Sequence, residues 1–125
     1  MNIVERYNVE LRPLMKGRDY SVTLRLKKKD GAPISAEGRV FQLAVKHSPH
    51  QSDDEAVIFV VEEPTGTDAE EGWVTLVVPY ADSVDIPATR YHFDVVMYAP
   101  GLSKQSLMQG RLPVVQTVSH TVEAP

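Results

Sequence analysis

The sequence contains no cysteine among its 125 residues. The absence of thiols excludes disulfide bonds, zinc sites built from thiolates and cysteine nucleophiles. It does not identify the redox compartment in which the protein works. A domain of this length buries roughly two-thirds of the surface that its unfolded chain exposes, so it folds without cross-links of this kind.

Long apolar runs are also missing. The longest run is AVIFVV, residues 56–61, which is far below the ~20 residues that a membrane-spanning helix needs. Glu5, Arg6 and Glu10 interrupt the apolar residues near the N-terminus, which therefore lacks the continuous apolar core of a signal peptide. We expect neither a signal peptide nor a membrane partner.

Basic charge and catalytic motifs are scarce as well. The 13 Lys and Arg residues are outnumbered by 17 Asp and Glu residues, which gives a net charge of −4. A field of this sign repels a phosphate backbone, so nucleic acid is not an expected partner. The segment GLSKQ, residues 101–105, begins like a nucleophile elbow but has Gln105 where the motif requires glycine. The glycines form no phosphate-binding loop, and we expect no catalytic activity and no cofactor.

What the sequence has instead is a regular alternation of apolar and polar residues. Seven runs show this pattern or are short and apolar throughout: residues 3–11, 20–26, 40–45, 56–61, 73–78, 91–97 and 107–118. Proline and glycine recur too often for a long helix. Seven short strands in one domain, residues 1–125, predict an all-β, antiparallel, immunoglobulin-like β-sandwich. Residues 119–125 are expected to form an extended tail.

Several features refine this prediction. The runs 56–61 and 73–78 are apolar almost throughout, as in strands that are covered on both faces. Tyr91 lies early in the sixth run, two residues before the inward Phe93, which is the position of a tyrosine corner. The two acidic loops, residues 47–56 and 62–72, are the segments that we expect to be most mobile.

His92 and Asp94 lie two positions apart, so a strand directs both side chains to the same face. A metal site would need a third ligand, such as His47 or His50. Pro49 separates these two histidines and argues against the helix on which their spacing binds metal. Because outward strand positions are ordinarily polar, we expect His92 and Asp94 on a solvated or covered outer face and predict no metal site.

Carboxylates gather in the two acidic loops. They lack the alternating spacing of a calcium-binding loop and are expected to be solvated. These residues are Asp53, Asp54, Glu55, Asp68, Glu70 and Glu71.

The segment RLKKKDG is the only basic cluster. Alternation directs Arg25, Lys27 and Lys29 to one side. Such a ridge is typical of an edge strand that is protected against unwanted pairing. It is equally suited to an acidic patch on a neighbouring molecule.

Two further groups of residues are candidate contact surfaces. Trp73, the only tryptophan, is expected mainly as a core anchor, with sugar stacking and an interface role as the alternatives. The strand face that carries His92 becomes apolar at Val96 and Tyr98, which indicates a surface covered by a partner.

The order of turns and strands resembles a group of small phage virion domains, of the kind of the N-terminal domain of the baseplate upper protein of tailed phages. The segments that carry the resemblance are MKGRDYSVTLRL, KKDGAPISAEG, RVFQLAV, EGWVTLVVP, TRYHFDVVMY and LMQGRLPVVQTVS. Two departures stand out. Arg18 separates a glycine and an acid that are usually adjacent, and the spacer before Tyr91 holds Pro87 and Ala88 in place of a glycine.

The resemblance covers residues 8–118 and implies an immunoglobulin-like sandwich that attaches parts of a virion to one another. It transfers no catalytic residue. It implies a homo-oligomer in a larger assembly, with other virion proteins and copies of itself as partners, and a virion that is assembled in the host cytoplasm. The position could be in the tail, baseplate or fibre, or on the head. The alternative is a carbohydrate- or surface-binding sandwich with Trp73, Tyr80 and Tyr98 as stacking platforms.

Overall fold

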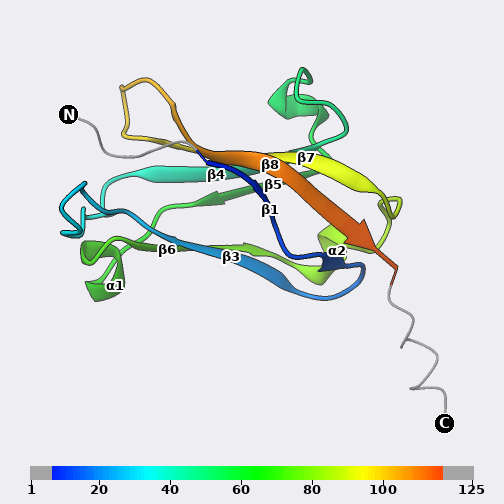
Figure 1. The fold of residues 1–125 in the computed structure, drawn as a ribbon, viewed down its shortest axis with the longest axis horizontal. Coiled ribbons are helices and arrows are strands. Elements are labelled where there is room, and N and C mark those ends of the chain that lie inside the picture. Colours follow the sequence, from blue (N-terminus) through cyan, green and yellow to red (C-terminus); the bar gives the residue numbers. More distant parts are fainter. Residues whose placement is uncertain (1–6, 117–125) are drawn as a thin grey trace, which may run out of the picture.

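The structure is a computed structural model and describes residues 7–116. It is built mostly of β-strands, with three short helical turns between them (Figure 1). In chain order the elements are β1 (Tyr7–Glu10), β2 (Leu14–Met15), β3 (Tyr20–Arg25), β4 (Val40–Lys46), η1 (Asp53–Glu55), β5 (Ile58–Glu62), α1 (Thr67–Glu70), β6 (Trp73–Val78), α2 (Tyr80–Ser83), β7 (Arg90–Tyr98) and β8 (Gln105–Val115).

All seven predicted strands are present, and the two-residue β2 is added to them. The ends of the first and last predicted runs, residues 3–6 and 117–118, lie outside the described residues, as does the expected tail 119–125. The prediction of no long helix agrees with the structure, in which α1 and α2 each have four residues.

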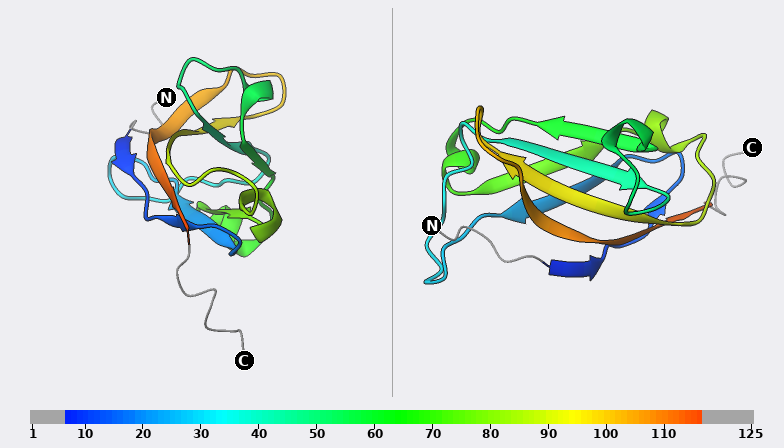
Figure 2. Two further views of the ribbon diagram at one scale, coloured as in Figure 1. Left: turned by 90° about the vertical axis from the view of Figure 1, so that its right-hand side faces the viewer. Right: turned by 90° about the horizontal axis from the view of Figure 1, so that it is seen from above.

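The strands form two sheets. The large sheet has the order β1-β8-β7-β4-β5, with β2 also paired to β8, and the small sheet contains β3 and β6. The small sheet lies along one face of the large sheet, which is curled when seen end-on (Figures 1 and 2). We call the opposite face of each sheet, the one turned away from the other sheet, its outer face.

The prediction of an antiparallel architecture is wrong for the large sheet. β1 and β2 run parallel to β8, whereas β4, β5 and β7 pair antiparallel. Alternation in a sequence reports which face a side chain takes but not the direction of the neighbouring strand. The chain between β1 and β8 supplies the long crossover that a parallel pair requires.

The core lies between the two sheets. On β7 the burial alternates along the whole strand, with Tyr91, Phe93, Val95 and Met97 inside, as the sequence predicts. The largest fully buried side chains from the other strands include Phe41, Leu43, Leu76, Val78 and Leu112. The hydroxyl of Tyr91 donates to the carbonyl oxygen of Pro87 at 2.7 Å, which confirms the predicted tyrosine corner.

The prediction that β5 and β6 are covered on both faces is wrong. Phe59 and Val61 on β5 have exposed fractions of 41% and 47%, and on β6 the residues Trp73, Thr75 and Val77 all face solvent. β5 is an edge strand of the large sheet, and no described segment forms a third layer over the small sheet. Apolar residues therefore remain on the outside at positions where strands usually carry polar ones.

Candidate functional site

The outer face of the large sheet carries most of the candidate residues. Because Tyr91 and Phe93 point inward, His92 and Asp94 share the outer face of β7, as predicted. The strand register places His92 between Lys46 of β4 and Arg111 of β8. Directly opposite side chains on neighbouring strands begin roughly 5 Å apart. Three basic side chains thus form a row across three strands.

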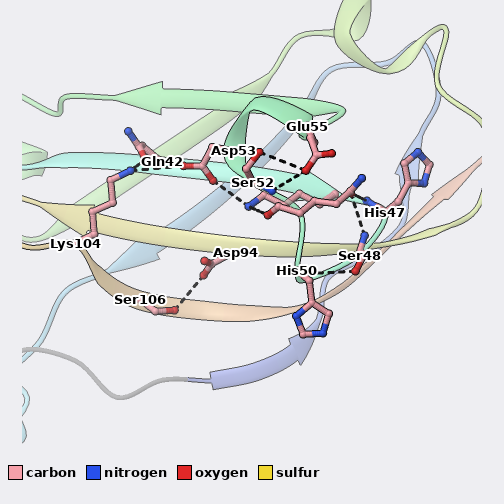
Figure 3. Close-up of polar contacts among 12 residues, drawn as sticks. Gln42, His47, Ser48, His50, Ser52, Asp53, Glu55, Asp94, Lys104 and Ser106 are labelled. Carbon is pink, nitrogen blue, oxygen red and sulfur yellow. Dashed lines mark hydrogen bonds and ion pairs between the residues drawn. The ribbon is translucent and has the colours of Figure 1, made fainter.

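The acidic loop 47–56 folds back over this face (Figure 3). Asp53 accepts a hydrogen bond from Lys46 Nζ at 3.0 Å and forms an ion pair with Lys104 Nζ at 3.6 Å. The hydrogen bond from Lys46 is the main cause that lowers the pKa of Asp53. Partial burial opposes it, and the charges of both lysines lower the pKa further. One carboxylate of the loop thus connects the loop to the end of β4 and to Lys104, the residue just before β8.

The same loop also has an internal set of hydrogen bonds. Gln51 Oε1 accepts the backbone N–H groups of His47 and Ser48, and Glu55 Oε1 accepts the N–H of Ser52. Lys46 Nζ donates to the carbonyl oxygen of Gln51 at 2.9 Å. The loop therefore has a defined shape over the sheet, and its carboxylates do not converge on one point.

The second acidic loop is anchored in a different way. α1 places Ala69 in the core, where it is 1% exposed, and the carbonyl oxygen of Ala69 accepts the N–H of Ala36 at 2.7 Å. Glu37 accepts the N–H of Gly66 through its carboxylate at 3.1 Å. The carboxylates of Asp68 and Glu70 stay in solvent at this end of the molecule.

A second polar cluster lies further along the outer face. Gln42 is only 9% exposed; its amide donates to the hydroxyl of Tyr98 at 3.4 Å and its oxygen accepts from Lys104 Nζ at 3.0 Å. Lys104 also lies 5.6 Å from the ring centroid of Tyr98. The part of this face around Val96 and Tyr98, expected to lie under a partner, is thus already half-covered by Lys104 of the same chain.

Between the row of basic residues and the loop lies a pocket of about 320 Å³. It is lined by Ala44, Lys46, Pro49, His92, Phe93, Asp94, Gln109, Gly110 and Arg111. Burial lowers the pKa of His92 below its ordinary value of 6.5, and the charges of Arg111 and His50 lower it further. Beside it, Asp94 accepts a hydrogen bond from the hydroxyl of Ser106 at 3.0 Å.

The histidines do not gather as metal ligands. The ring of His47 lies against that of Tyr91 in a tilted contact, with ring centroids 4.9 Å apart, and His47 does not line the pocket that contains Asp94. Within residues 7–116, no group of three or more His, Asp or Glu side chains is placed to hold a metal ion.

The predicted basic ridge is only partly continuous. β3 ends at Arg25, and Lys27 forms an isolated bridge with Pro33, while Lys27 and Lys29 stay exposed. Arg25 lies 4.9 Å over the ring of Trp73 and donates to the backbone and the carboxylate of Glu71. Arg25 is therefore part of the outer face of the small sheet, and the lysines belong to the turn beyond it.

The prediction of Trp73 as a core anchor is wrong. Its side chain is 42% exposed on the outer face of the small sheet, because it takes the outward parity of β6 and pairs with Arg25. The three aromatic residues of the alternative sugar platform do not come together. Trp73 begins β6, Tyr80 follows its end, and Tyr98 lies on the outer face of the other sheet.

Sequence reasoning missed Gln42, Lys104 and Arg111. None of them belongs to a motif, and each acquires its role only when β4, β7 and β8 pair. Arg111 has one sequence signal: it follows Gly110 in a strand that otherwise alternates, which places it on the same outer face as Gln109.

No protein-family model matches the sequence, and none of the curated proteins is significantly similar to it. Among residues 7–116, no helix has the length and apolar character needed to cross a membrane.

Proposed function

We propose that this chain is a non-enzymatic structural protein of a tailed-bacteriophage virion. It works as an immunoglobulin-like module that joins tail, baseplate or fibre components, or decorates the head. Its partners are other virion proteins and copies of itself.

The observation that carries this proposal is the set of exposed apolar residues on β5 and β6, two strands that lie next to each other. Those of β5 lie on the outer face of the large sheet and those of β6 on the outer face of the small sheet, so they flank one edge of the molecule. Phe59 and Val61 on β5, and Trp73 and Val77 on β6, are each between 41% and 49% exposed. Exposed apolar groups on adjacent strands are typical of surfaces that contact other proteins, and Trp and Phe are enriched at the centres of such contacts.

Two structural features support the immunoglobulin-like form of the module. The strands make two layers around one core, and Tyr91 forms the upstream hydrogen bond of a tyrosine corner. The parallel β1–β8 pair departs from a purely antiparallel sandwich. The resemblance to the phage baseplate domain adds the virion context.

The mechanism is assembly through many copies. Each copy contributes a modest contact area, and the linkage of copies in a symmetric ring raises the effective concentration of the remaining contacts. The free edge of the molecule at β5 and β6 then contacts the neighbouring subunit.

The test compares the purified protein with variants that place a charge on this side. Sedimentation velocity over a range of concentrations is expected to show self-association of the wild type, and Val61→Lys and Val77→Lys are expected to shift it toward monomer. Ala88→Lys, at an exposed position outside these strands, adds the same charge and serves as the control.

A second measurement addresses the virion itself. Mass spectrometry of gradient-purified particles is expected to detect this chain together with tail or capsid proteins. A monomer at all concentrations that is also absent from such particles would refute the proposal.

A further inference from the structure

The pocket beneath the loop 47–56 has an uneven distribution of charge. Lys46, His92 and Arg111 form its basic row, and His50 is close enough to act on His92 electrostatically. Among the described residues that line it, Asp94 is the only one with a carboxylate; it pairs with Gln109 and Ala44 in the neighbouring register position and accepts a hydrogen bond from Ser106. In a protein of net charge −4, this is a local excess of positive charge.

Hydrogen-bond donors remain available in the pocket. Lys46 gives two of its three N–H groups to Gln51 and Asp53, which leaves one for a ligand. Within residues 7–116, the guanidinium of Arg111 has no hydrogen-bond partner, and Arg111 is an exposed residue of the pocket lining. Arginine presents parallel donors that fit the two oxygens of a carboxylate or phosphate.

We propose that this pocket binds an oxyanion, a carboxylate or a phosphate group, between Arg111 and His92. Asp94 sets a second requirement for the ligand. Its Oδ1 accepts the hydrogen bond from Ser106, so its Oδ2 can accept one from a donor on the ligand. The preferred ligand therefore carries a donor next to the oxyanion, such as the P–OH of hydrogen phosphate or the N–H beside a peptide carboxylate. This inference does not depend on the proposed virion role.

The loop makes the site more than a flat row of charges. Pro49 forms one wall of the pocket, and the bonds of Asp53 to Lys46 and Lys104 hold the loop over the sheet. A group that enters is partly shielded from water, which strengthens its interaction with Arg111.

Binding is expected to depend on pH in a defined direction. The groups that face His92 are Lys46 from β4, His50 from the loop, Asp94 from its own strand and Arg111 from β8. Burial lowers the pKa of His92, and the positive charges of Arg111 and His50 lower it further. A bound anion offsets these charges, so it raises that pKa. By linkage, affinity increases as the pH falls through the titration range of His92.

The experiment follows the backbone amides and the His92 imidazole by NMR. Inorganic phosphate is added at constant ionic strength, with sodium chloride as the compensating salt. A second titration uses the peptide GTDAEEG, residues 66–72 of the chain, against the neutral peptide GTNAQQG, both with acetylated N-termini and amidated C-termini, so that only the side-chain carboxylates differ. The expected result is a saturable shift at His92 and Arg111 and a rise in the pKa of His92. Phosphate alone indicates a free anion as the natural ligand, and the acidic peptide alone indicates a carboxylate on a protein.

Two substitutions that each remove one positive charge distinguish binding at a specific site from general electrostatic attraction to the protein. Arg111→Gln is expected to weaken binding at least tenfold, whereas Lys28→Gln, at an exposed position in the turn after β3, is expected to leave it unchanged. His92→Gln, which keeps a polar side chain, is expected to weaken the binding of both probes. It is expected to abolish the pH dependence for the acidic peptide, whose carboxylates do not titrate in the range of His92. Equal losses from Arg111→Gln and Lys28→Gln, or no rise in the pKa of His92 with either probe, would overturn the proposal.

Discussion

The outer faces of the two sheets differ in what lies over them. On the large sheet, Gln42 and Ala44 are 9% and 6% exposed although they point away from the core. Lys104 bonds to Gln42, and Ala44 lines the pocket beneath the loop 47–56 together with Pro49. On the small sheet, Val77 at the corresponding outward parity is 49% exposed. The outer face of the large sheet is covered by its own chain at β4, although Phe59 and Val61 on its edge strand β5 stay exposed, whereas the outward residues of β6 on the small sheet all face solvent.

The difference shows that an apolar strand face and a covered strand face are separate properties. The covered face carries polar groups that bond to one another, because buried polar groups need partners. The bare face carries apolar groups and Thr23 and Thr75, whose hydroxyls lie 3.1 Å apart across the strands. A partner protein has more to gain on the bare face, since apolar area is still available there.

The largest expected effect tests the close backbone contact between the residue before β6 and the segment that follows β3. Gly72 has a φ of +92°, and a Cβ added there would lie 2.6 Å from Leu26 O and 2.8 Å from Ile34 O. Gly72→Ala is expected to reduce the free energy of unfolding by at least about 2 kcal/mol, because the cost of a positive φ for alanine and the cost of the clash with the backbone oxygens add up. Gly38→Ala, at a φ of +77° with open space around it, should cost only about 1 kcal/mol. Urea denaturation measures both, and equal losses would mean that the contact with Leu26 is unimportant.

The second effect concerns the anchoring of β7. Tyr91→Phe removes the hydrogen bond to Pro87 and leaves its carbonyl oxygen without this partner. The expected loss in the free energy of unfolding is about 1–2 kcal/mol. Tyr98→Phe removes a longer bond, of 3.4 Å, on the outer face, and should cost less than about 1 kcal/mol. Urea denaturation of the two variants measures both losses. A larger loss of stability for Tyr98→Phe than for Tyr91→Phe would contradict the prediction.

A smaller effect tests how Asp53 holds the loop 47–56 over the outer face of the large sheet. Asp53→Asn weakens the link to Lys46 and Lys104. Because the Asp53 side chain is 47% exposed, the expected cost is below about 1 kcal/mol. The clearest readout is hydrogen exchange, which should quicken in residues 47–56. Asp54→Asn removes a charge from the neighbouring exposed position and should leave the exchange unchanged.

The pKa of Asp53 gives this prediction a pH dependence. Its pKa in the folded protein is lower than the ordinary value of 3.8, so its contribution is complete above that pH and is lost as the pH falls below it. The stability difference between wild type and Asp53→Asn should therefore vanish in acid. A difference that persists well below pH 3.8 would exclude the ion pair as its cause.

The smallest expected effect comes from His92. Its pKa is lower in the folded protein than the ordinary 6.5, so the unfolded chain takes up the proton first as the pH falls. Stability should decrease below pH 6.5 and level off once the folded protein is protonated too. His92→Gln should remove this part of the pH dependence in thermal unfolding, and an unchanged profile would exclude His92 as its source.

Much of the fold could be predicted from local pattern. The alternation in residues 91–97 identified the buried side of β7, and the position of Tyr91 identified its hydrogen bond. The sequence-based prediction of burial was wrong for strands whose coverage depends on segments that are distant in the sequence. Residues 56–61 and 73–78 looked like covered strands because their apolar content is high, yet coverage depends on a further layer, which no segment within residues 7–116 supplies there.

The candidate site was predictable only in part. The shared face of His92 and Asp94 follows from their spacing, which is a local property. Their surroundings do not, because Lys46, Arg111 and Pro49 come from three other segments.

The sequence by itself determined the strands, their inward residues and the tyrosine corner, because these depend on side-chain parity and on contacts within a few residues. Only the tertiary structure decided the parallel pairing of β1 with β8, the exposure of Trp73 and the gathering of Lys46, His92 and Arg111 around one pocket. These features depend on which strands become neighbours, and that choice is made by the packing of the whole chain around one core.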